Sequence, residues 1–252
     1  MKTSNKLLVA AVLLLVTVAI VNALTLKSRF TVVLAHDRPE VRSFPAERFN
    51  IIEITGTAPR GNTGYQPLLV TVKRADSMYV TYSKMDFIRV EQVDDTLKVT
   101  VEHPKGYDGN VLVRPLIVIE CPELIAINAI GTPLDSLNLP EDTHVLTRLH
   151  YQKSEVTVAG FDGMAMDVFA AEGMEITLDS LAVDSLSARA ERAGTVQIRR
   201  NTLGHADLTV GDGATITLLH TQIGTVATAV AEKGQFIVKG TQLKALGARS
   251  VH

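Results

Sequence analysis

The residues best suited to chemistry are a serine, a histidine and an aspartate. Ser185, His205 and Asp207 fall where residues twenty apart are expected to be neighbours, which invites comparison with a hydrolytic triad. Flat strand faces, however, offer no oxyanion hole and no cleft that excludes water. All three residue types are also common on solvated surfaces. We therefore predict an interaction surface here and no catalytic residue.

Threonines form a second group of candidate surface residues. Thr177, Thr195, Thr215 and Thr217 fall on one outer face if the strands repeat every ten residues. A ladder of threonines could order water, yet threonine also favours strands for its shape alone. We predict that these side chains belong to an interaction surface.

The remaining suggestive residues have simpler interpretations. Arg189, Arg192, Arg199 and Arg200 are predicted to lie in solvated turns, with contact to an anionic glycan or lipid headgroup as the alternative. Cys121 is the only cysteine, which excludes an intramolecular disulfide, and its apolar neighbours predict a small buried side chain. The sequence therefore predicts no metal site and no cofactor.

A ten-residue repeat that begins near residue 155 must position these surfaces. One column, from position 156 to position 236, reads Val, Met, Ile, Leu, Val, Ala, Ile, Val and Phe at intervals of ten. The column two residues further on is apolar except at Thr228, and the position between the two columns is mostly polar. This period-two alternation is typical of strands with one buried face.

The connecting turns double the period to twenty residues. Gly173, Ala193 and Gly213 are small residues at one turn. The other turn is expected to hold Val183, Leu203, Ile223 and Leu243. Two unlike turns indicate two strands per coil, so the sequence predicts an all-β fold that contains a parallel β-solenoid. An antiparallel meander is the alternative, but hairpins have no reason to keep a constant register.

Short segments rich in Val, Ile, Thr and Tyr predict further strands before these repeats. The predicted organisation is a short tail at 1–6, a transmembrane anchor or signal peptide at 7–26, a linker at 27–47, a β-rich N-terminal part of the solenoid domain at 48–153, the regular repeats at 154–245 and a tail at 246–252.

The segment Leu7–Leu26 contains no charged residue and as a helix would span about 30 Å, the thickness of a bilayer's hydrocarbon core. We predict a single transmembrane helix that stays attached as a signal anchor. A cleavable signal peptide is the alternative, because Lys2 and Lys6 precede the span and Val21-Asn22-Ala23 resembles a cleavage site. Both interpretations place the β domain outside the cytoplasm, whereas the basic residues after the span would by themselves favour the opposite orientation.

Composition narrows the function further. The net charge of −2 argues against a nucleic-acid-binding protein, which needs a basic stripe. The chain has no tryptophan and only 5% aromatic residues, which argues against a lectin that stacks sugars on aromatic rings.

The segments FNIIEITGT, DSMYVTYS, VEQVDDTLKVTV and PLIVIECPELIAINAIGT resemble the auto-transporter adhesin head GIN domain family of bacterial envelope proteins, over roughly residues 45–245. The resemblance implies an extracytoplasmic β-solenoid with an adhesive or envelope role, and it brings no catalytic residues. This chain differs in its degenerate repeat before residue 154 and in having a hydrophobic anchor in place of a lipoprotein cysteine.

Together these features predict a membrane-anchored protein of the bacterial cell envelope with a structural, adhesive or protein-interaction role and no catalysis. The expected partner is an envelope protein or glycan, and a strand edge near Phe236–Val238 could serve for stacking. The alternative is a β-helix protein that binds or cleaves an envelope polysaccharide.

Overall fold

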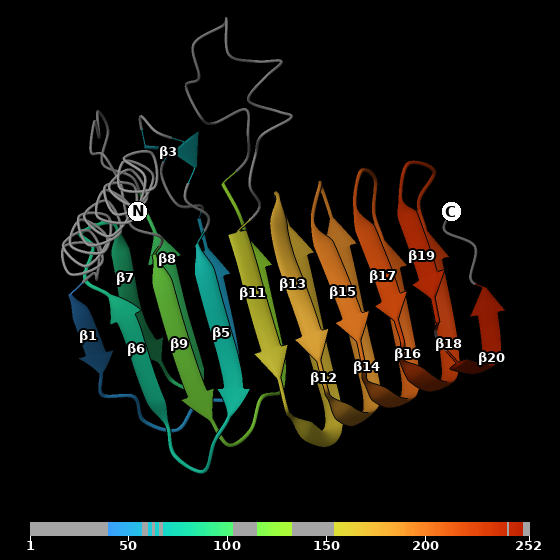
Figure 1. Ribbon diagram of the computed structural model, residues 1–252, viewed down its shortest axis with the longest axis horizontal. Coiled ribbons are helices and arrows are strands. Elements are labelled where there is room, and N and C mark those ends of the chain that lie inside the picture. The colour runs from blue at the N-terminus through green and yellow to red at the C-terminus, as the bar shows by residue number, and fades with distance from the viewer. Residues whose placement is uncertain are drawn as a thin grey trace, which may run out of the picture. The chain divides into compact units, whose positions relative to one another are not determined.

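The computed structural model describes residues 40–56, 60–61, 64–65, 68–102, 115–132, 154–240 and 242–248 (Figure 1). The chain divides into two compact units, Met1–Pro39 and Glu40–His252, and all described residues belong to the second. The predicted transmembrane segment at 7–26 therefore lies outside the described residues. Within them every regular element is a strand, which confirms the all-β prediction, and no helix there could span a membrane.

Two mixed sheets of nine strands each make up the described part of the second unit, together with a hairpin of β3 (Arg60–Gly61) and β4 (Gly64–Tyr65). In spatial order, sheet A contains β1 (Val41–Phe44), β6 (Tyr79–Ser83), β9 (Leu116–Cys121), β5 (Leu69–Arg74), β11 (Ser154–Ala159), β13 (Met174–Asp179), β15 (Thr195–Arg199), β17 (Thr215–Leu219) and β19 (Gln235–Lys239). Sheet B contains β20 (Gln242–Ala248), β18 (Gln222–Val230), β16 (Thr202–Val210), β14 (Ala182–Glu191), β12 (Asp162–Ala171), β10 (Ala126–Ile130), β2 (Ile51–Thr55), β8 (Thr96–Val101) and β7 (Ile88–Val93). The sheets face each other and enclose one hydrophobic core (Figure 1).

From β11 onward, successive strands alternate between the sheets, and each pairs in parallel with the strand twenty residues away. Val156 is the register partner of Ile176 in sheet A, and Leu186 is the partner of Ala206 in sheet B. Both predicted apolar columns face the core, because every member from Val156 to Val226 is at most 3% exposed. The ten-residue spacing therefore gave the correct inward face of each strand.

The N-terminal strands continue the same two sheets in a non-sequential order. Strand β10 is inserted between β2 and β12, so Ile127 has Ile52 as its parallel partner on one side and Val168 on the other. At the far end of the sheets, β6 pairs antiparallel with β9, and β7 pairs antiparallel with β8. Strand β1, which lies within the predicted linker at 27–47, pairs antiparallel with β6.

The apolar residues expected in turns lie inside strands instead. Val183, Leu203 and Ile223 are second residues of β14, β16 and β18 and are nearly fully buried. The two residues that follow Val183 are not buried, so the period-two alternation breaks at what we call the corner. The prediction of an apolar plug in a turn is wrong for these three residues, because the strand bends at the corner without ending. Leu243 lies in β20, whose side chains are not described.

The turn between the sheets is formed instead by residues in the left-handed backbone region. Positive φ angles recur at intervals of twenty residues in one column: Gly160, Ser180, Arg200, His220 and Gly240. The described residues that follow them are buried and change from apolar to polar along the stack: Phe161, Leu181, Asn201 and Thr221. The Asn201 side chain accepts a hydrogen bond from the Leu181 backbone N–H at 2.7 Å and donates one to the Leu178 carbonyl at 3.2 Å, so side chains satisfy backbone groups at this turn.

Candidate functional site

The predicted serine, histidine and aspartate do lie on one outer face of sheet B. Ser185 is the register partner of His205, which in turn partners Thr225, and all three occupy consecutive strands. Asp207 lies two residues along β16 from His205 and is the register partner of Ser187. We call these five residues the His205 face.

The His205 face is not arranged as a hydrolytic triad. The Nδ1 atom of His205 lies 2.7 Å from Thr225 Oγ1, so this nitrogen, which an aspartate would orient in a triad, hydrogen-bonds to a threonine. Ser185, His205 and Asp207 are all half-buried on a sheet surface. What the arrangement offers is a row of hydrogen-bonding side chains about 4.8 Å apart, the spacing between paired strands.

The threonines of sheet A form a less continuous surface. Thr177 and Thr217 share a column, but Gln197 lies between them and its Nε2 donates to Glu175 Oε1 at 2.6 Å. Thr215 is half-buried, whereas Thr195 is only 6% exposed. Thr195 was predicted to be part of an open surface, and this is wrong because its side chain is covered.

An aromatic residue beside the His205 face was not singled out from the sequence. Phe169 lies half-buried on the outer side of sheet B, between its register partners Asn128 and Arg189. The Arg189 guanidinium carbon is 5.8 Å from the centre of the Phe169 ring, and Arg189 Nε donates to Glu191 Oε1 at 2.7 Å. The period-two alternation that predicts an outward side chain at His205 also predicts one at Phe169.

The arginines predicted to lie in solvated turns are each paired with a carboxylate. Arg192 and Arg200 lie between strands and are exposed, as predicted. Arg189 and Arg199 lie in strands, which corrects the prediction for these two residues. Arg192 Nε lies 2.8 Å from Glu172 Oε1. Each described arginine of this group therefore neutralises a nearby acid, and the group forms no open basic patch.

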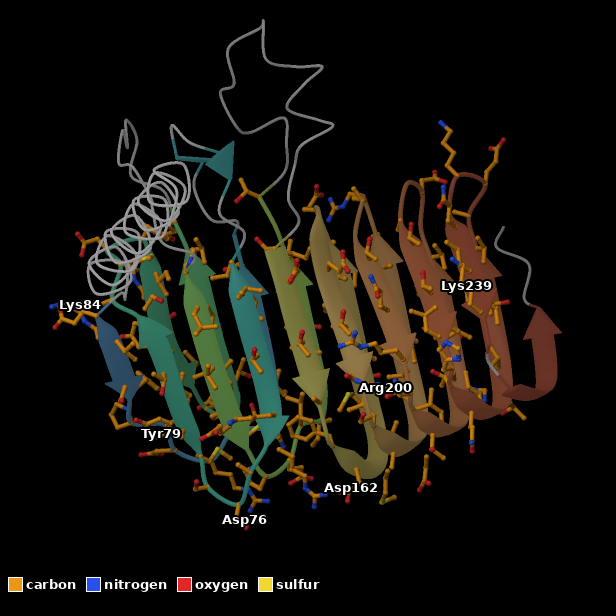
Figure 2. All side chains as sticks on the ribbon, in the orientation of Figure 1. Asp76, Tyr79, Lys84, Asp162, Arg200 and Lys239 are labelled. Atoms are coloured by element: carbon orange, nitrogen blue, oxygen red, sulfur yellow. The ribbon has the colours of Figure 1, made fainter. Side chains whose placement is uncertain are left out.

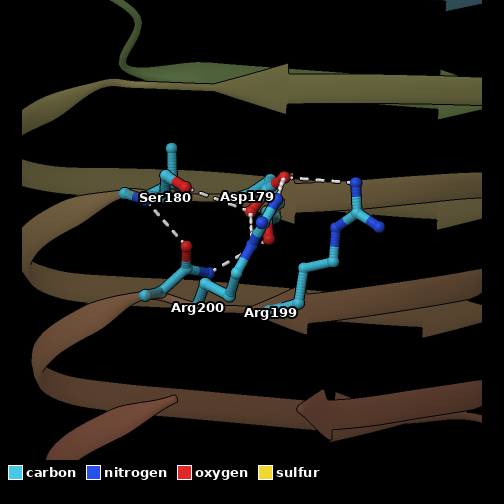
Figure 3. Close-up of polar contacts among 7 residues, drawn as sticks. Asp179, Ser180, Arg199 and Arg200 are labelled. Atoms are coloured by element: carbon cyan, nitrogen blue, oxygen red, sulfur yellow. Dashed lines mark hydrogen bonds and ion pairs between the residues drawn. The ribbon is translucent and has the colours of Figure 1, made fainter. Parts of the chain in front are cut away.

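Asp179, at the end of β13, forms ion pairs with two of these arginines (Figure 3). Arg200 Nε donates to Asp179 Oδ1 at 2.8 Å, its second nitrogen contacts Oδ2, and Arg199 Nη2 lies 3.1 Å from Oδ2. Ser180 Oγ donates to Oδ1 at 3.1 Å. These contacts, led by the hydrogen bond from Arg200, lower the pKa of Asp179 below its ordinary value. We call this group the Asp179 cluster.

Two shallow hollows lie where the strands of sheet A end, in the region of Asp76 and Asp162 (Figure 2). The larger, of 670 Å³, contains Arg48, Met78 and Glu123 in its wall, and the smaller, of 590 Å³, contains Asp76 and Ser180. Arg74 lines both and forms an ion pair with Asp162, while Arg48 Nη2 lies 3.3 Å from Glu123 Oε2. Because opposite charges pair within the larger hollow, it has no strong preference for an ion of either sign.

No family model matches this chain, and no curated protein matches its sequence. Among solved structures, it is similar to a candidate adhesin of Bacteroides fragilis at 13% identity, over 84% of this chain and 97% of that chain, with a TM-score of 0.46. A candidate lipid-binding protein of Parabacteroides distasonis matches at 14% identity over 85% and 97% of the two chains, with a TM-score of 0.41. A candidate adhesin of Parabacteroides merdae matches at 16% identity over 84% and 96%, with a TM-score of 0.37.

The described residues include no group of three or more His, Cys, Asp or Glu side chains that could hold a metal ion. Cys121 is fully buried, as its apolar neighbours predicted, and burial raises the pKa of its thiol to about 12. A thiol with this pKa stays protonated at neutral pH and is a poor nucleophile.

Proposed function

We propose that this chain is a non-catalytic adhesive protein of the bacterial envelope, with residues 154–245 forming a β-solenoid and residues 7–26 anchoring it to a membrane. The parallel register of Ser185, His205 and Thr225 carries the proposal, because it repeats hydrogen-bonding side chains on consecutive strands. The twenty-residue offset between paired strands supports the solenoid.

The His205 face suits a polar, extended partner. Its side chains are short and can donate or accept hydrogen bonds, and they follow a straight row of paired strands. A partner that runs along the row would meet a new group at about every 4.8 Å. We propose no catalysis, because the His205 ring is hydrogen-bonded to Thr225 and the His205 face lies on the outer surface of a sheet.

A second candidate function, binding of an envelope polysaccharide, is favoured by Phe169. Sugar rings stack on aromatic faces and hydrogen-bond to carboxylates and amides beside them. Asn128 is the register partner of Phe169, and Asp167 lies two residues earlier in β12, on the same outer side. The Phe169 ring already faces Arg189, so a sugar would share or displace that contact.

The test compares the adhesion of cells that express the full chain with the adhesion of cells that lack it, in a flow chamber coated with envelope material. The triple variant Ser185→Ala, His205→Ala and Asp207→Ala should lower retention to the level of cells lacking the protein. The comparison variant, Thr177→Ala with Thr217→Ala, changes the less continuous threonine surface of sheet A. It should retain cells as the unmodified chain does if the His205 face is the adhesive surface. Equal retention by the triple variant would refute the His205 face as the adhesive surface.

Two further measurements separate the alternatives. Release of reducing ends from envelope polysaccharide by the unmodified chain, and its loss in the triple variant, would establish catalysis and overturn the proposal. If the partner is a polysaccharide, Phe169→Ala should reduce retention on a polysaccharide-coated surface, whereas unchanged retention there would exclude Phe169 from the binding site.

A further inference from the structure

The last strand of sheet A exposes an apolar side chain that is buried in the strands before it. Val238 of β19 is 42% exposed, whereas Leu218 and Ile198 in the same inward column are 0% exposed. Phe236, the other inward residue of β19, is also only partly buried. The hydrophobic core is therefore open at the β19 edge.

In the described part of the chain, no strand pairs with the outer side of this edge. Strands β19 and β20 are the last described strands of sheets A and B, so each has one side with no neighbouring strand in the sheet. Backbone N–H and C=O groups along such an edge pair readily with another strand. Since the two edges lie at the same end of the two facing sheets, the best partner would offer two strand edges at once (Figure 1).

A second copy of this chain offers both edges with the required spacing. Rotation by 180° about an axis perpendicular to the sheets would place β19 antiparallel to the second copy's β19, and β20 antiparallel to the second copy's β20. Both sheets would then continue across the contact, as in an isologous dimer.

The sequence of β19, Gln-Phe-Ile-Val-Lys, is complementary to itself in this arrangement. Antiparallel pairing centred on Ile237 places Phe236 opposite the second copy's Val238, so the exposed inward residues cover each other. Lys239, the only charged residue in β19, then faces Gln235 and not another lysine. Centring the pairing on Val238 instead would place Ile237 opposite Lys239, which is less favourable.

We propose that the edge formed by β19 and β20 is a self-association surface, through which two copies join end to end by two-fold antiparallel strand pairing. This inference is independent of the adhesive partner, because the His205 face lies on the outer side of sheet B and not on this edge.

Disulfide trapping in the full chain, purified in detergent, tests the register. Paired residues on antiparallel strands have Cα atoms about 4.5–5.5 Å apart, which a disulfide can bridge. Ile237→Cys should therefore form a covalent dimer on mild oxidation with copper phenanthroline. The native Cys121 is fully buried and contributes no cross-link.

Two controls make the test specific. Thr217→Cys occupies the same outer column one strand earlier, about 14 Å from its counterpart at a strand spacing of about 4.8 Å, and should stay monomeric. Gln235→Cys alone should also stay monomeric, yet a mixture of Gln235→Cys and Lys239→Cys chains should form a mixed dimer.

Several outcomes would overturn the proposal. One is a monomeric Ile237→Cys chain under conditions that oxidise a model thiol, and another is equal cross-linking of Thr217→Cys. Light scattering that finds only monomers of the unmodified chain at the same concentration would show that another partner, or another segment of the chain, covers this edge.

Discussion

Asp179 sits at a strand end where two arginines from the next strand of sheet A and its turn converge on one carboxylate. Its side chain is only 10% exposed, so water screens these contacts less than it screens an ordinary surface ion pair. The same carboxylate also accepts a hydrogen bond from Ser180. The Asp179 cluster therefore stabilises the contact between adjacent strands and depends on the charge of a single group.

This charge predicts an acid-sensitive contribution to stability. Because the contacts lower the pKa of Asp179 below 3.8, the stabilisation is complete above that pH and is lost as the pH falls through the lowered pKa. We expect Asp179→Asn to reduce the melting temperature at pH 7, and the difference from the unmodified chain to shrink as the pH falls below 3.8. Circular-dichroism melts across this range provide the measurement.

The exposed carboxylate Asp184 at the corner offers a control for the charge change itself. Asp184→Asn should shift the melting temperature little at any pH. If the melting temperature of Asp179→Asn stays below that of the unmodified chain by the same amount from neutral to acid pH, the carboxylate acts through its shape and not through its charge.

At the scale of the strand, the corner depends on close backbone contact between successive strands. A Cβ atom at Gly224 would lie 2.4 Å from the Gly204 carbonyl oxygen, and one at Gly204 would lie 2.6 Å from the Asp184 carbonyl oxygen. Real side chains do not approach backbone oxygens this closely, so the paired strands β14, β16 and β18 would have to separate at the corner.

We therefore expect Gly224→Ala to destabilise the fold by about 1–3 kcal/mol, the range for overpacking a close contact. Gly163→Ala is the matched control, since a Cβ there meets no atom within 4 Å and its φ lies outside the left-handed region. That change should be neutral or stabilising by up to about 1 kcal/mol. Urea unfolding measures the free energy of unfolding of both variants. Equal values for the two would contradict this account of the corner.

Strand order shows where the sequence was informative and where it was not. The offset of twenty identifies register partners such as Asp179 and Arg199, so the Asp179 cluster could have been predicted from the same columns as His205. The insertion of β10 between β2 and β12 could not have been predicted, because no constant residue offset relates these three strands. For the same reason the ion pair of Arg74 with Asp162 could not be predicted from the sequence.

For the whole molecule, the prediction that matters most for function is the side of the membrane on which the β domain lies. The uncharged segment Leu7–Leu26 favours export of the β domain, whereas the basic residues after it favour retention. Lys233 lies exposed in the turn before β19, and Cys121 is buried, so a cysteine at position 233 would be the reactive thiol of the folded chain.

We expect Lys233→Cys to react with a membrane-impermeant maleimide in intact spheroplasts. The unmodified chain, with its buried thiol, is the control and should stay unlabelled until it is denatured. Labelling of Lys233→Cys only after the spheroplasts are lysed would place the β domain in the cytoplasm and exclude an adhesive role at the envelope surface.

The constant register of the paired strands has a consequence for how such a protein changes over evolutionary time. Duplication of a twenty-residue segment would add one strand to each sheet, lengthen both sheets by about 4.8 Å and leave every column aligned. An insertion of one residue within a strand would instead turn its buried side chains outward. Under the adhesive function proposed above, each such duplication would raise the valency of the His205 face, and avidity would grow with strand number even if the affinity of each contact stayed weak.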